Sequence, residues 1–201
     1  MPGDYSVDNI RRVFSSSTDF NEIFDVFQAA LRQHLNDVEL YRLLFWNHSL
    51  TPDEIRLFGE KLASEFPEMA YDVYLWLASV FEVTYSSSDN YELALHYYQK
   101  AAAARPAEPD PYLDACDCYD PDLNIPPVTQ LIEFVHRGIE HVGNPSSLYR
   151  RLSRLYLTAG DERKSEHYRR LSEGSAGEEP PGPPPTPPPP RPDLPPPPPP
   201  A

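Results

Sequence analysis

Cysteine is scarce in this chain, with only Cys116 and Cys118 among 201 residues. Two residues apart, they are too close together for an ordinary disulfide, and no second pair supplies the remaining ligands of a zinc site. We therefore interpret Cys116 as a small packing residue. So few cysteines indicate a reducing compartment, and we expect a cytoplasmic protein.

Long apolar runs are missing as well. No stretch approaches the roughly 18 apolar residues that a membrane-spanning helix requires. The first six residues contain neither a basic start nor an apolar run, which argues against a signal peptide. We expect no membrane association.

The sequence shows no motif of enzyme chemistry. It lacks a glycine-rich phosphate loop, a nucleophile elbow and a pair of catalytic histidines. His136 and His141 lie five residues apart, not the four that place two metal ligands on one helix face, and we expect both on a partly exposed helix surface. We predict no catalytic residue, no cofactor and no metal, and therefore a protein that is not an enzyme.

Positive charge is sparse over most of the chain. Residues 1–136 carry eight basic and 23 acidic side chains, a net charge of −15, whereas residues 137–170 carry eight basic and four acidic ones, a net charge of +4. A negative body repels phosphate backbones, so nucleic acid is not the expected main partner.

The pattern that is present is helical. Apolar residues recur at helical spacing almost throughout, and no segment alternates like a strand. We expect a helix over residues 7–14, a second one capped by Thr18 or Asp19 in a capping box with Glu22, and a third that begins at Asp37. Thr51, followed by a proline and two acids, is a strong start signal for a fourth helix that closes before Pro67.

The most informative stretch contains Ala94, Tyr98, Ala101 and Pro106, at spacings of four, three and five residues. Small residues one turn to either side of an aromatic allow a second helix to approach closely, and a proline just past the end stops the helix. A helix with the pattern Tyr-x-x-small-small-x-x-aromatic recurs three times along the chain. Its members are Tyr74, Leu77, Ala78 and Phe81; Tyr112, Ala115, Cys116 and Tyr119; and Tyr149, Leu152, Ser153 and Tyr156.

These positions resemble the tetratricopeptide repeat over about residues 70–171, with a degenerate pair before it at residues 37–67. The spacing from Ala78 to Ala94 is four residues longer than the family's, and we expect Ser86 to Asp89 to absorb the difference as a loop. The resemblance implies an all-α, right-handed solenoid of about four antiparallel helix pairs. A generic helical bundle and related repeats, such as Sel1-like or half-a-TPR, are the alternatives.

We divide the chain into an N-terminal helical segment (residues 1–36), a repeat domain (residues 37–172) and a disordered proline-rich tail (residues 173–201). The tail holds 16 of the 26 prolines and too little apolar surface to fold. One stretch resembles the ligand of EVH1 domains and would also suit profilin: Asp193, Leu194, Pro195, Pro196, Pro197 and Pro198. The tail is thus either a ligand for a polyproline-binding domain or a spacer.

The resemblance also implies a concave groove lined by first-helix residues. Counted from the three tyrosines that open the pattern, these are Asp72, Leu75, Ser79 and Glu82; Asp110, Leu113, Asp114 and Asp117; and Arg150, Arg151 and Arg154. The groove would be acidic in its middle and basic at its C-terminal end.

Arg150 and Arg154 could hold an acidic or C-terminal peptide, because a guanidinium matches a carboxylate in shape and charge. The co-chaperone members of the family use basic and asparagine residues as a carboxylate clamp, and the acids here depart from that pattern. The alternative is that the arginines pair with Asp114 and Asp117 across adjacent repeats.

We therefore predict a non-enzymatic adaptor or scaffold that binds a peptide or protein partner in the groove. A small acidic chaperone that holds a client protein is the main alternative. RNA binding through the basic last hairpin, residues 150–170, is the third.

Overall fold

The computed structural model describes residues 5–84 and 88–175, and it is helical over most of this length. The elements are α1 (Val7–Ser16), α2 (Phe20–Arg32), α3 (Val38–Phe45), α4 (Pro52–Glu65), a 3-10 turn η1 (Pro67–Met69), α5 (Ala70–Thr84), α6 (Ser88–Ala104), α7 (Asp110–Asp114), α8 (Val128–Ile139), α9 (Ser146–Thr158) and α10 (Glu162–Ser175). Within these ranges there is no strand, only an isolated antiparallel bridge between Asp120 and Ile125.

The early helices begin where the sequence supplies caps. Asp37 accepts hydrogen bonds from the backbone of Glu39 and Leu40, and Thr51 forms a full capping box with Glu54. Each cap satisfies amide groups that the first helical turn leaves without a partner.

The expected capping box at the start of α2 is wrong. Asp19 caps α2 by accepting from the Asn21 amide, but the Glu22 carboxylate instead accepts from the Ser17 hydroxyl. Glu22 is thereby turned back toward the end of α1.

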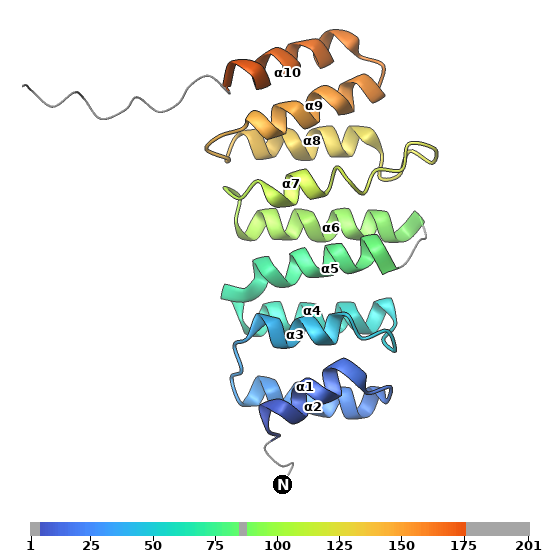
Figure 1. Cartoon of the computed structure of the whole chain (residues 1–201), viewed down its shortest axis with the longest axis vertical. Coiled ribbons are helices and arrows are strands. Elements are labelled where there is room, and N and C mark those ends of the chain that lie inside the picture. Colours follow the sequence, from blue (N-terminus) through green and yellow to red (C-terminus); the bar gives the residue numbers. More distant parts are fainter. Residues whose placement is uncertain (1–4, 85–87, 176–201) are drawn as a thin grey trace, which may run out of the picture.

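The helices stack in antiparallel pairs into one elongated array, from α1 and α2 at one end to α9 and α10 at the other (Figure 1). Odd-numbered helices also touch one another, α1 with α3, α3 with α5, and α7 with α9. They therefore form one layer, which we call the inner layer. The two helices expected in the N-terminal segment, α1 and α2, form a pair of their own that stacks on the four pairs of the repeat region, so the array holds five pairs within the described residues.

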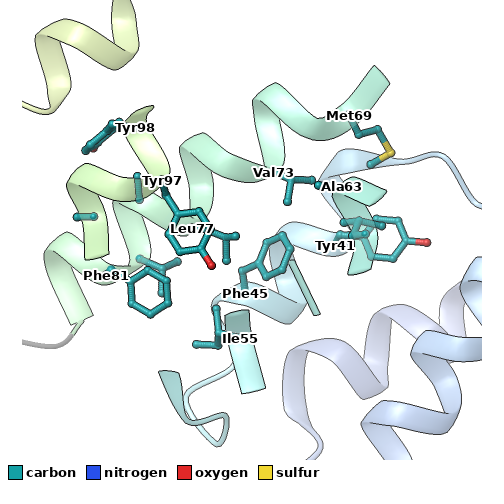
Figure 2. Close-up of a cluster of buried hydrophobic side chains, with 14 of the residues drawn as sticks. Tyr41, Phe45, Ile55, Ala63, Met69, Val73, Leu77, Phe81, Tyr97 and Tyr98 are labelled. Carbon is teal, nitrogen blue, oxygen red and sulfur yellow. The ribbon is translucent and has the colours of Figure 1, made fainter. Parts of the chain in front are cut away.

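One hydrophobic core runs through the array from Ile10 to Leu155. Between the second and third pairs, side chains of α3 and α4 meet those of α5 and α6 around Leu77 (Figure 2). Ala78, Ala94 and Ala101 are fully buried, as their small size and spacing predicted. Burying such apolar area is the main favourable contribution to the stability of the stack.

The fourth pair, α7 and α8, departs from its pattern. A regular first helix was expected to carry Tyr112 to Tyr119, but α7 ends at Asp114 and the chain continues in turns. The amides of Cys116 and Asp117 bond three residues back, which is the tighter 3-10 geometry. Pro121 bars any helical continuation beyond this segment, because its ring would clash with the carbonyl four residues before it and it has no amide to donate.

Two other boundaries differ from expectation. Ser88 and Asp89 belong to α6 and not to the predicted loop, whose remaining residues 86 and 87 lie outside the described part of the chain. Helix α10 extends to Ser175, three residues into the predicted tail. The rest of the tail, including the stretch from Asp193 to Pro198, lies outside the described residues.

Candidate binding groove

The four predicted groove residues of α5 lie on the inner layer but are already engaged. Asp72 lies 3.6 Å from an Arg105 guanidinium nitrogen, and the Glu82 carboxylate accepts from the Tyr98 hydroxyl at 2.9 Å. The Ser79 hydroxyl donates to the Leu75 carbonyl of its own helix at 3.0 Å, while the Leu75 side chain packs against the core. This part of the groove therefore offers few polar side chains that are free to bind a ligand.

The carboxylates near α7 gather into an acidic cluster. Partial desolvation, followed by repulsion from Asp110, Asp117 and Glu82, raises the pKa of Asp114 to about 6, and attraction to Arg151 offsets part of this rise. Asp110, Asp114, Asp117 and Glu82 thus lie close enough to repel one another. That they form the acidic middle of a binding groove stays a prediction.

Arg151 of α9 forms an ion pair with Asp117, one member of the acidic cluster. Its two terminal nitrogens donate to the two carboxylate oxygens of Asp117 at 2.6 and 2.9 Å, a bidentate pair. An arginine thus pairs with Asp117 across adjacent repeats, but it is Arg151 and not Arg150 or Arg154. This ion pair joins the fourth helix pair to the fifth.

Arg150 and Arg154 make no ion pair within the described residues. With Leu113, Ser147 and Arg151 they line a hollow of about 240 Å³ between α7 and α9, which we call the arginine hollow. Because they lie on consecutive turns of one helix, Arg150 and Arg154 point to the same side. The hollow therefore presents two uncompensated cations above an apolar wall.

Sequence reasoning missed a second hollow in the inner layer, of about 430 Å³, between α1 and α3. Ser15, Arg42, Leu43 and Trp46 line it. Trp46 is 42% exposed, and the Arg42 guanidinium lies 5.6 Å from the ring centre of Trp76 on α5. We call Leu43, Trp46 and Trp76 the tryptophan patch. The chain holds only these two tryptophans. The spacing of apolar residues in the sequence could not show that both lie in the inner layer.

The cysteines and His136 occupy packing positions, whereas His141 is exposed in the turn after α8. Burial raises the pKa of the Cys116 thiol to about 12, and Cys118, the more deeply buried of the two, lies in the core. The ring of His136 lies 3.0 Å from the Tyr156 hydroxyl and packs edge-on against Tyr168, between α8, α9 and α10. Within residues 5–84 and 88–175, no three acidic, cysteine or histidine side chains are grouped to hold a metal ion.

No helix among the described residues combines the length and apolar character needed to cross a bilayer. This finding agrees with the absence of long apolar runs from the sequence.

Comparison with known proteins yields likeness at the level of fold. No family model matches the chain, and no curated protein does. Among solved structures, a crystal structure of MamA protein superposes with a TM-score of 0.50 at 18% identity, over 84% of this chain and 91% of that one. MamA from Desulfovibrio magneticus RS-1 gives 0.48 at 15% identity, over 87% of this chain and 97% of that one. The helix-pair array and the likeness to the first of these structures together show that the chain has the fold of a tetratricopeptide-like helical repeat protein.

Proposed function

We propose that the inner layer binds an extended acidic segment of another protein, and that the chain acts as a non-enzymatic adaptor or scaffold. The observation that carries the proposal is the arginine hollow, where Arg150 and Arg154 have no ion-pair partner among the described residues. An uncompensated guanidinium at a concave surface favours a carboxylate, which it can hold with two parallel hydrogen bonds.

The acidic cluster gives the groove a direction. Asp110 and Asp114 lie on α7, next to the arginines of α9, so a carboxylate shifted toward α7 meets like charge. Such repulsion mainly fixes the position of the ligand along the groove, and it adds little to the affinity. The acidic part of the ligand is therefore expected at α9, and Leu113 offers an apolar contact beside it.

The state of the other cations supports a peptide over RNA. Within the last hairpin, Arg169 and Arg170 pair with Glu166, Lys164 pairs with Asp161, and Arg151 pairs with Asp117. Half of the eight basic residues of segment 137–170 are thus already neutralised. A phosphate backbone needs a run of free cations, which this face does not offer.

The test is a titration of the full chain with a fluorescein-labelled peptide of sequence Leu-Glu-Glu-Leu-Glu-Asp and a free C-terminal carboxylate. In the double variant Arg150→Ala/Arg154→Ala we expect affinity to fall about tenfold or more, because each charged hydrogen bond contributes about 1.5–3 kcal/mol. The matched control is Arg11→Ala/Arg163→Ala, which removes the same charge from exposed positions outside the hollow. Equal affinity of the two double variants would move the binding surface elsewhere.

A further inference from the structure

We propose that residues 176–201 lie along the inner layer of their own chain. In this arrangement Glu178 and Glu179 sit at the arginine hollow, and the proline run reaches the tryptophan patch. The inference rests on the proposed function, because it gives the same groove an internal occupant that a partner peptide must displace.

The segment begins beside the arginine hollow. The Ser146 hydroxyl at the start of α9 donates to the Ser172 carbonyl in the last turn of α10 at 3.0 Å, so the end of α10 lies against the first turn of α9. Ser147 and Arg150, which line the hollow, lie on that first turn and the next. Glu178 and Glu179 follow Ser175 by three and four residues, a reach of about 13 Å.

The charges on the two sides are complementary. Arg150 and Arg154 have no ion-pair partner among the described residues, and Glu178 and Glu179 are the first charges of the chain after α10. A tether this short holds the two carboxylates at a high effective concentration near the arginines. Even exposed pairs that are weak between separate molecules can then be populated within one chain.

The segment is long enough to follow the inner layer to α3. Neighbouring helices pack about 10 Å apart, so the three steps from α9 to α3 span about 30 Å. The 26 residues from 176 to 201 extend about 80 Å at the rise of a polyproline helix. Residues 180–190 carry no charge, so they can cross the acidic cluster at α7 without repulsion.

The tryptophan patch suits the far part of the segment. Extended proline-rich chains bind to grooves lined with aromatic side chains, because the flat ring packs on the proline ring and little entropy is lost. Trp46 is 42% exposed beside the larger of the two hollows, and Leu43 forms its apolar wall. Trp46 also lies at the end of α3, in the inner layer that the segment would follow.

The experiment uses Trp46 as the reporter. In the full chain carrying Trp76→Phe, Trp46 is the only tryptophan, and its emission maximum and quenching by acrylamide report whether it is covered. Three further versions carry Glu178→Arg/Glu179→Arg, Arg150→Glu/Arg154→Glu, or all four changes. We expect each charge reversal alone to shift the emission to longer wavelength and to raise the quenching constant. The fourfold swap, which restores opposite charges, should bring both values back.

Two results would overturn the inference. One is equal quenching of Trp46 in all four proteins. The other is protection that disappears on dilution, because the segment would then bind a second copy of the chain.

A peptide titration separates this inference from the proposed function. The labelled acidic peptide is titrated into the Glu178→Arg/Glu179→Arg chain, where the arginines would be free. Binding there that Arg150→Ala/Arg154→Ala abolishes supports the groove whatever the tail does. Restored protection in the charge swap without any peptide binding supports the tail contact and rejects the proposed ligand.

Discussion

Gly138 of α8 faces the ring of Tyr112 of α7 so closely that a methyl group on its Cα would lie 2.7 Å from the ring's Cγ atom. Tyr112 is buried and its hydroxyl donates to the Pro106 carbonyl at 3.1 Å, so the ring is held in place. Because Gly138 has no side chain, the ring of Tyr112 packs directly on the α8 backbone, and this contact holds the short α7 against α8.

Gly138→Ala is therefore expected to destabilise the protein by about 1–3 kcal/mol through overpacking, although alanine is the better helix former by about 1 kcal/mol. Urea denaturation followed by circular dichroism measures the difference. Gly174→Ala is the control, because a methyl group there meets no atom within 4 Å and it should stabilise slightly. A Gly138→Ala protein as stable as the control would show that Tyr112 can move aside.

Asp114 makes stability depend on pH. Its pKa of about 6 in the folded chain lies above its ordinary value of 3.8, so between these values the folded state binds more protons than the unfolded one. Its contribution to stability therefore falls as pH rises through 6.

Asp114→Asn removes this penalty and should raise Tm at pH 7.5 but leave it nearly unchanged at pH 4. Asp114 is only partly removed from water, so we expect a gain below about 1 kcal/mol. Thermal melts at the two pH values measure it, with Asp53→Asn, an exposed acid on α4, as the control. A gain that is the same at both pH values would show that like-charge repulsion and desolvation of Asp114 are not its cause.

In the proposed complex, Asp117 would compete with the acidic ligand for Arg151. Asp117→Asn breaks the bidentate pair and leaves a third cation in the arginine hollow, so the labelled acidic peptide should bind more tightly and with a steeper dependence on salt. Fluorescence titrations at two salt concentrations measure both effects. Glu140→Gln, which removes a charge of the same sign from α8's C-terminal cap, is the comparison. Unchanged affinity in Asp117→Asn would place the peptide away from Arg151.

Asn47 fastens the first helix pair to the second. Its buried amide donates to the carbonyls of Phe14 and Ser17, both at 3.0 Å. Asn47→Ala leaves two buried carbonyls without this donor and should cost about 1–3 kcal/mol, with faster hydrogen exchange in α1. Asn36→Ala, which removes an exposed amide bonded to Glu68, should cost much less. Slow exchange retained in α1 of Asn47→Ala would show that apolar contacts alone hold it.

The repeat architecture could be predicted because its determinants are local. Ala78, Ala94 and Ala101 had to be small wherever helices cross, and each is buried. The Thr51 cap likewise depends only on the next three residues. Most of the fold could therefore be predicted from helical spacing within short windows of the sequence.

The features that the sequence analysis did not predict depend on contacts between residues far apart in the chain. The link from Asn47 to Phe14 spans 33 residues and leaves no periodic trace in the sequence. Trp46 caps α3 outside the apolar stripe, so spacing gave it no role. In the fourth pair, the tyrosine pattern did not reveal that α7 ends at Asp114. The cytoplasmic location and the roles of the groove residues stay predictions.

The brevity of α7 has a mechanical consequence. It spans five residues, whereas α5 spans 15 and α9 spans 13, so the inner layer is thinnest in the fourth pair. Segments with less buried contact open at lower free energy than their neighbours. We therefore expect the array to bend at α7 more readily than within the helix pairs on either side.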